Sequence, residues 1–342
     1  MKPALSVLID TYNHEKYIEQ ALLSAIEQDF PAGDYEIVVV DDGSTDRTPE
    51  IVRKFGPRVR LLRKENGGQA SAFNVAIPEL QGEIVAFLDG DDWFAPGKLT
   101  AVMNALAEHP EAAAIGHGYY EYHDGSGSSE KRAPTAAFYA DLATPDAARL
   151  AHSAWPFLIM GALTARRTAL ERLGPVAPVL RFCADSPIAV GLLASGAWII
   201  PQPFCFYRHH GSNLYVDADA HDSKSRSRFE MMELMYRELE RLMSQLGVRK
   251  ECAAALFYAN WVDFSRRRLS TFGGSRLEAL ETEMRGFRSE HEAPSSRYRL
   301  FKYLVVGTAA LLLPASRFYR ARDWYGRRNL GRLRNLVCKA SH

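Results

Sequence analysis

Two stretches decide the fold: Val38-Val-Val-Asp-Asp-Gly-Ser-Thr-Asp46 and, further along, Phe87-Leu-Asp-Gly-Asp-Asp-Trp93. Each is a run of apolar residues that ends abruptly in a cluster of carboxylates. In open α/β sheets, ligands bind at the carboxyl ends of the strands. Two acidic strand ends therefore predict one site that holds a nucleotide and a divalent metal ion.

Short apolar runs and helical patterns alternate regularly over residues 1–110. The runs have the composition of strands buried on both faces of a parallel sheet. They are Leu5–Ile9, Glu36–Val40, Val59–Leu62 and Ile84–Leu88. The helical patterns lie between and after them, around Ile18–Ile26, from Thr48 as the cap, and from near Pro96. This alternation predicts an α/β protein with a doubly wound, mostly parallel sheet.

The rest of the chain divides into two further parts. A polar stretch from Tyr122 to Pro134 predicts a loop or hairpin tip between a nucleotide half, 1–110, and an acceptor half, 111–215. In the acceptor half we expect helices over Arg166–Leu173 and Asp185–Ser195. Trp198–Ile200 and Phe204–Tyr207 are expected to be strands. Residues 216–342 are predicted to form a helical C-terminal region.

Charge is distributed unevenly along the 342 residues, although the net charge is only +1. Residues 297–342 hold 11 Lys and Arg and one acid, Asp323, so this tail carries about +10 and the remainder about −9. The four cysteines lack CxxC spacing, which indicates reduced thiols rather than disulfides or zinc. The N-terminus lacks the apolar segment and cleavage site of a signal peptide. We therefore expect a cytoplasmic protein.

The tail contains the most apolar segment of the chain, Tyr303–Pro314, which is about half of the ~20 residues needed to span a bilayer. One interpretation is a buried core helix. The other is an interfacial anchor, because arginines interleaved with aromatics follow at once. The second predicts attachment of residues 297–342 to an anionic membrane, at its inner face. Basic arms also bind nucleic acid, but the apolar neighbour favours lipid, and no nucleic-acid partner is expected.

Asp89-Gly-Asp91-Asp92 can gather three carboxylates at one strand end. Such a cluster repels itself unless a cation is present, and Mg²⁺ or Mn²⁺ prefers a few carboxylates completed by substrate phosphates. The alternative is a solvated turn with helix caps. At the other acidic strand end, Asp42 can accept the imide N–H of a pyrimidine or the hydroxyls of a ribose.

Four ordered motifs give the chain a resemblance to the inverting family 2 glycosyltransferases. They are Ser6–Asn13, Val39–Asp46, Asn66-Gly-Gly-Gln-Ala-Ser-Ala-Phe-Asn74 and Phe87–Trp93. The resemblance implies the GT-A fold, a Rossmann-like sheet, with a C-terminal helical extension. It implies that Asp10 and Tyr12 flank the nucleotide base and that Asp42 bonds it. Asp89 is expected near ribose and metal, with Asp91 as the principal metal ligand.

In the third motif, Asn66 and Gly68 open a helix, and glycine-rich backbone at such a position can approach an anion closely. The family places its catalytic carboxylate in a Glu-Asp pair at the start of a later helix. The matching segment is Cys183-Ala-Asp185, where alanine replaces the glutamate. Asp185 is the expected general base, the alternative being a helix cap. In the segment Phe206–Asn213, Arg208 or His210 is expected to meet the diphosphate.

Together these features predict a metal-dependent inverting glycosyltransferase (EC 2.4) with Mg²⁺ or Mn²⁺ as cofactor. The expected donor is a nucleoside-diphosphate sugar, first a UDP-sugar, and the acceptor is a glycan or lipid-linked hydroxyl in polysaccharide or glycolipid synthesis. The main alternative is a non-catalytic sugar-nucleotide or membrane-binding protein on the same fold, which Ala184 favours. A sugar nucleotidyltransferase is less favoured, because Asp10–Lys16 lacks a glycine-rich first loop.

Overall fold

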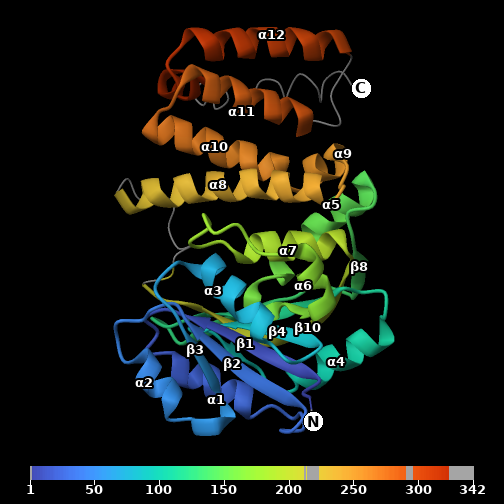
Figure 1. Ribbon diagram of the computed structural model, residues 1–342. Coiled ribbons are helices and arrows are strands. Elements are labelled where there is room, and N and C mark those ends of the chain that lie inside the picture. Colours follow the sequence, from blue (N-terminus) through green and yellow to red (C-terminus); the bar gives the residue numbers. More distant parts are fainter. Residues whose placement is uncertain (1, 212, 214–222, 290–295, 323–342) are drawn as a thin grey trace. The chain divides into compact units, whose positions relative to one another are not determined.

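The computed structural model describes residues 2–211, 213, 223–289 and 296–322 (Figure 1). The chain forms two compact units, of which the first comprises Met1–Asp217 and Leu234–Ala253. The second comprises Ala218–Glu233 and Ala254–His342. The expected domain boundary at residue 215 stays a prediction.

The first unit is built on a ten-stranded sheet with the order β3-β2-β1-β4-β9-β6-β10-β5, to which β7 and β8 add at β6 and β10. Neighbours in the block β3-β2-β1-β4 are parallel, as are β6 and β10, whereas β9, β5, β7 and β8 pair antiparallel. The strands are β1 Leu5–Thr11, β2 Tyr35–Asp41, β3 Arg60–Arg63, β4 Ile84–Asp89, β5 Trp93–Phe94, β6 Ala114–His123, β7 Ser128–Arg132, β8 Phe138–Ala140, β9 Thr164–Arg166 and β10 Ala197–His209.

Helices cover both faces of this sheet (Figure 1). Alternate residues of β1, such as Leu5, Val7 and Ile9, are fully buried in one core with apolar residues of α1, α2 and α4. On the other face Phe73 of α3 packs edge-on against Phe87 of β4, with 5.9 Å between ring centroids. The helices of this unit are α1 Ile18–Ile26, α2 Thr48–Arg53, α3 Gln69–Ala76, α4 Lys98–Glu108, α5 Pro145–Ala154, α6 Arg167–Leu173, α7 Asp185–Ala194 and α9 Lys250–Ala253.

The four strands expected in the first 110 residues are all present, and each runs one or two residues further at its carboxyl end. Two details of the expectation were wrong. Thr48 is the first residue of α2 and not its cap, because the Asp46 carboxylate accepts the Thr48 N–H at 2.9 Å. The two strands expected after Trp198 are one strand, β10, whose pairing with β6 shifts register on either side of Pro203.

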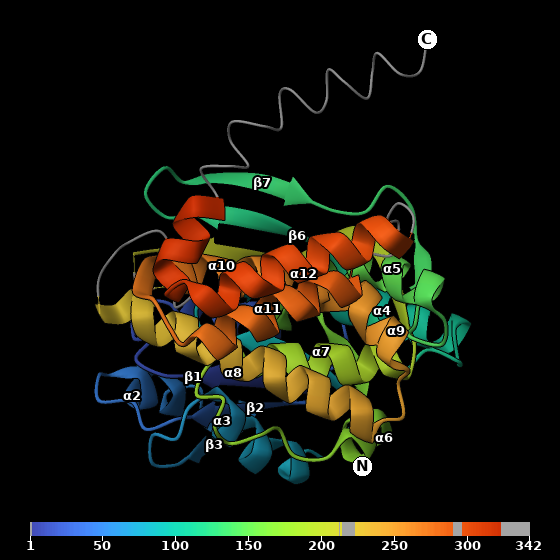
Figure 2. The ribbon, with the colours of Figure 1, turned by 90° about the horizontal axis from the view of Figure 1, so that it is seen from above.

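The second unit is helical, as expected for the C-terminal region. Figures 1 and 2 show α10, Ala259–Phe272, α11, Arg276–Ser289, and α12, Ser296–Leu312, side by side. The long helix α8, Ser223–Gln245, contributes its first part to this unit and its second part to the other. Among the helices in the described part of the chain, none combines the length and the apolar character needed to cross a membrane.

Candidate active site

Parallel strands bring acidic side chains to one edge of the sheet. Asp10 of β1 lies in register with Asp89 of β4, and Thr11 lies in register with Asp41 of β2. Gly90 directly follows Asp89, and a Cβ at this position would come within 2.6 Å of the Thr11 hydroxyl oxygen. Only glycine lets this acidic turn pack so closely on β1. The ends of β1 and β4 therefore form the floor of the site at the predicted edge.

Asp10 and Asp89 resist ionisation. Burial raises the pKa of Asp10 to about 7; a hydrogen bond with Asp89 opposes this shift, and the charge of Asp91 adds to it. Burial and then the charges of Asp10, Asp92 and Asp91 hold the pKa of Asp89 well above the ordinary value of a carboxylate. Like charges at this spacing are too costly to coexist in a poorly solvated place. The floor therefore retains a proton near neutral pH unless a cation compensates it.

Asp91 behaves in the opposite way, because two histidines face it. Its Oδ2 lies 3.0 Å from His210 Nε2 and 3.8 Å from His14 Nε2. Burial alone would raise the pKa of Asp91, but the hydrogen bond from His210 and the charges of both histidines outweigh it and lower the pKa. Asp91 is thus the ionised member of the cluster.

Arg208 holds this acidic turn against β10. The Asp92 carboxylate accepts the Arg208 N–H at 2.7 Å, and the Arg208 side chain donates to the Asp91 carbonyl at 2.7 Å. The other guanidinium nitrogens donate to Asp124 at 2.7 Å and to Gln20 at 2.5 Å. The expected contact between Arg208 and a diphosphate stays a prediction, and within the protein the side chain already has a positioning role.

The donor atoms at this edge suit a hard divalent cation. Two buried carboxylate oxygens, Asp10 Oδ1 and Asp92 Oδ2, have no hydrogen-bond partner among the described residues. The described carboxylates here do not converge into a three-ligand cage, and Mg²⁺ or Mn²⁺ is commonly completed by substrate phosphates. That Asp89 and Asp91 hold this ion stays a prediction, and the ion would supply positive charge to a leaving diphosphate.

Asp42 holds the glycine loop, which consists of residues Asn66 to Gly68, at the edge of the sheet by hydrogen bonds. One of its oxygens accepts from Lys64 Nζ at 2.6 Å and from the Gly67 N–H at 3.0 Å, and the other accepts from the Gly68 N–H at 2.7 Å. Gly68 has a φ of +87°, and a Cβ there would lie 2.4 Å from Arg181 Cα. Asp42 is therefore already well hydrogen-bonded, and its expected bond to a nucleotide base stays a prediction.

Tyr12 directly follows β1, and Asn66 lies in this loop. The Tyr12 side chain is 44% exposed, which leaves its ring available to stack on a planar group. The Asn66 amide donates to the Asp42 carbonyl at 3.0 Å and its oxygen accepts from Arg181. Tyr12 thus has the exposure that its expected role requires, whereas Asn66 supports the loop.

Gln69 connects the acidic floor to the start of α7. Its Nε2 lies 3.5 Å from Asp10 Oδ2, and its Oε1 accepts the Ala184 N–H at 3.0 Å. Its own N–H donates to the Arg181 carbonyl at 2.8 Å. Cys183, with the left-handed φ of 63°, makes the turn that delivers the next residues to the site. A strained turn of this kind persists only where its surroundings fix it.

Asp185 is the first residue of α7. Burial raises its pKa, although hydrogen bonds with Ser186 and the helix backbone oppose the shift. The charge of Asp185 in turn raises the pKa of Asp89, so the two carboxylates share one electrostatic environment. A carboxylate whose pKa is raised toward neutrality, separate from the ionised Asp91, is suited to accept a proton.

The predicted site residues thus all lie around this sheet edge or on the loops that close it, and Arg208 does so through its hydrogen bonds to Asp91 and Asp92. Sequence reasoning did not assign roles to His14, Lys64, Gln69 and Arg181. Gln69 had a signal, because it lies inside the Asn66–Asn74 motif as a polar residue in the first turn of a helix. Arg181 had none, because its partners come from a distant loop.

Fold and site together define a glycosyltransferase of the GT-A type. Residues 6–174 match the family described as Glycosyl transferase family 2. An uncharacterized glycosyltransferase from Nostoc sp. is 30% identical over 239 residues, which are 66% of this chain and 72% of that protein. The chain belongs to glycosyl transferase family 2, which confirms the predicted family, fold class and enzyme class.

Two further similarities concern one enzyme of Staphylococcus aureus. Poly(ribitol-phosphate) beta-N-acetylglucosaminyltransferase TarS is 42% identical over 108 residues, which are 30% of this chain and 19% of that protein. The crystal structure of TarS 1–349 in complex with UDP-GlcNAc superimposes with a TM-score of 0.57 at 19% identity, covering 90% of each chain. At this identity the structural likeness concerns the fold, helical region included.

The raised pKa of Asp10 predicts a pH-dependent effect of Asp10→Asn on stability. Below its ordinary pKa of 3.8 the carboxyl is neutral in both folded and unfolded states, so the substitution removes no charge. Between that value and about 7 only the unfolded state loses the proton, which destabilises wild type increasingly. In metal-free protein we expect Asp10→Asn to gain stability relative to wild type across this window, by up to about 1.4 kcal/mol per pH unit.

Thermal unfolding of both proteins in chelator at a series of pH values measures this difference. Asp34→Asn, at the amino end of β2, is the matched control and should show no such trend. A difference between Asp10→Asn and wild type that does not change with pH would contradict the interpretation.

Proposed function

We propose that this glycosyltransferase is metal-dependent and inverting, and that it transfers a sugar from a nucleoside-diphosphate sugar to an acceptor hydroxyl. The observation that most supports this proposal is that two carboxyl groups of the site have opposite pKa shifts. Asp91 is held ionised beside two histidines, whereas Asp185, from a separate helix, has a raised pKa. Asp91 is thus suited to hold a cation that meets the diphosphate, and Asp185 is suited to accept a proton.

In the proposed reaction Asp185 accepts the proton of the acceptor hydroxyl while that oxygen attacks the anomeric carbon of the donor sugar. The bond from the anomeric carbon to the phosphate oxygen breaks, and its electron pair leaves with the nucleoside diphosphate. Attack from the face opposite the leaving group inverts the anomeric configuration. The link from Gln69 to Asp10 and Ala184 would keep Asp185 in register with the donor end of the site.

A UDP-sugar is the first donor that we propose. The exposed ring of Tyr12 supports a stacked base, and Asp42 directly follows the adjacent strand β2. The relative TarS was crystallised with UDP-GlcNAc, which supports the same choice of nucleotide. The acceptor we propose is a hydroxyl of a glycan or lipid-linked saccharide.

A donor screen tests this function directly. Purified protein is incubated with UDP-, dTDP- and GDP-sugars, with and without Mn²⁺ or Mg²⁺, and thermal stability and nucleoside diphosphate release are recorded. We expect one donor to raise the Tm in a metal-dependent way, and Asp91→Ala to abolish the shift because the ion loses its ionised ligand. Asp34→Ala should retain the shift.

The other outcomes of the screen separate the alternatives. Binding without turnover across a broad acceptor panel would favour the non-catalytic binding protein, for which Ala184 is the specific observation. Release of pyrophosphate would indicate a nucleotidyltransferase. No response to any donor in either metal would contradict the proposal.

Asp185→Asn tests the general base. Asparagine preserves the size of the side chain but cannot accept the proton, so we expect kcat to fall by about 10²–10⁴-fold with little change in donor KM. In wild type the rate should fall on the acid side with an apparent pKa above 3.8, because burial raises the pKa of Asp185. Near-full activity of a folded Asp185→Asn enzyme would refute the assignment, and Asp141→Asn serves as the matched control.

Helix α12 supports attachment to a membrane surface. Its small residues Gly307 and Ala310 are buried, and Ala310 belongs to a core cluster with Ala279 of α11. Its large apolar residues face outward instead, with Leu304 61% and Leu312 68% exposed. Exposed leucines on one face of a helix are unfavourable in water and favourable in the acyl boundary of a bilayer.

The basic residues that follow the helix favour an anionic membrane as the partner of this surface. Arg317 and Arg320 are exposed directly after the helix, and anionic lipids attract such side chains by about 1 kcal/mol each. We therefore propose that the enzyme is cytoplasmic and lies at the inner face of the membrane, where a lipid-linked acceptor would be found. The expected contribution of residues 323–342 falls outside the described residues.

Substitution of Leu304 and Leu312 by Glu tests the membrane surface. Because both side chains are exposed, the fold should persist, and we expect binding to vesicles of anionic phospholipid in a sedimentation assay to drop at least tenfold. Leu277→Glu, at an equally exposed leucine of α11, is the matched control. Equal binding of all variants, or equal binding to neutral vesicles, would contradict an anionic membrane partner.

A further inference from the structure

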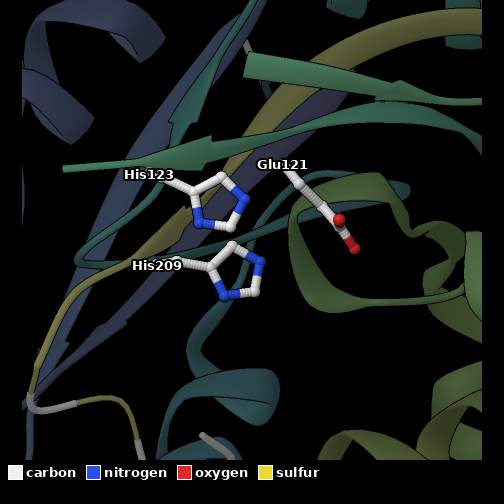
Figure 3. Close-up of side chains that lie close together, drawn as sticks. All are labelled: Glu121, His123 and His209. Carbon is white, nitrogen blue, oxygen red and sulfur yellow. The ribbon is translucent and has the colours of Figure 1, made fainter. Parts of the chain in front are cut away.

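A second cluster of metal-ligating side chains lies on the strands β6 and β10. Glu121 and His123 are two residues apart on β6 and therefore face the same side of the sheet. His209 of β10 pairs in register with His123. Figure 3 shows the two imidazoles and the carboxylate gathered together, and one potential ligand atom of each lies within 4.8 Å of the others.

These side chains have donor atoms to spare. His209 Nε2 is buried and has no hydrogen-bond partner in the described part of the chain. Arg132 donates two hydrogen bonds to Oε2 of Glu121, at 3.0 and 2.9 Å, so this carboxylate is held in place while lone pairs remain on its other oxygen. Hydrogen bonds of this kind commonly orient metal ligands.

The charges around the cluster are compatible with a cation. Arg132 also pairs with Glu130 at 3.1 Å, so two carboxylates surround one guanidinium. The rings of His123 and His209 stack with centroids 4.6 Å apart and planes 17° apart. Because the two rings are nearly parallel, the lone pairs of their nitrogens do not point toward a common centre. A tilt of the exposed His123 ring would direct its nitrogen toward the same point as the His209 nitrogen.

We propose that Glu121, His123 and His209 bind a borderline transition-metal ion, with Zn²⁺ as the leading candidate. Two imidazoles and one carboxylate are a ligand set that zinc accepts, with water in the remaining position. A pair of ligands two apart on a strand and a third on its neighbour suits a tetrahedral ion. None of these three residues belongs to the cluster around Asp89 and Asp91, whose predicted ligands are carboxylate oxygens.

Occupancy of this site has a structural consequence for the sheet edge. The ion would clasp the end of β6 to the end of β10, just before His210, which hydrogen-bonds Asp91. The proposal does not depend on the proposed glycosyl transfer, because it rests on the geometry of β6 and β10 alone.

Calorimetric titration of the full-length protein with Zn²⁺, in excess Mg²⁺ to fill oxygen sites, tests the proposal. We expect one Zn²⁺ per chain and an affinity at least tenfold weaker in His123→Ala, in His209→Ala and in Glu121→Gln. His152→Ala, on α5, is the matched histidine control and should bind as wild type does. Asp91→Ala should also retain Zn²⁺ binding, which separates this site from the catalytic one.

His123→Ala is the decisive variant, because His123 is exposed and its replacement should leave the Tm without metal unchanged. Absence of a wild-type Zn²⁺ site, or equal affinity in folded His123→Ala, would overturn the proposal. Stabilisation by inorganic phosphate in place of zinc, lost in the same variant, would also overturn it and would assign the cluster to an anion.

Discussion

The parallel register of β1 and β4 is the constraint on which the site depends, because it places Asp10 beside Asp89. Hydrophobic burial of both strands fixes this register, since a slip by one residue would turn their core side chains to the wrong face. The fold thereby forces two carboxylates together at a cost in stability. Such strain is typical of functional sites, where surrounding structure over-determines an unfavourable arrangement.

Hydrogen bonds in the loops around this edge connect the ends of β1 and β4 to the rest of the site. Asp42 accepts a hydrogen bond from the glycine loop. Gln69, which follows that loop, accepts the N–H of Ala184, directly before α7. On the opposite side Arg208 ties the Asp91–Asp92 turn to β10 and to Asp124. The two sides of the site are therefore connected through side chains that each have several hydrogen-bond partners.

The fold and the acidic floor could be predicted from sequence because both are local signals. Apolar runs such as Ile84–Leu88 are visible in the chain, and the carboxylates that follow them must lie at the strand ends. The roles of Arg208 and Gln69 could not be read in the same way. Their partners lie far away in sequence, and only the folded chain shows that the Arg208 side chain donates to Asp124 and to the Asp91 carbonyl.

The opposite pKa shifts of Asp89 and Asp91 bear on how the site changes when it is filled. The pKa of Asp91 is lowered, with His210 as its partner, whereas burial, followed by the charges of Asp10 and Asp92, raises the pKa of Asp89 and favours its protonated form. A cation that binds both must displace that proton, so its affinity depends on pH and falls as the solution becomes more acidic. The sheet register thus holds Asp10 and Asp89 side by side, so that a proton at low pH, or a bound cation at higher pH, would offset their mutual repulsion.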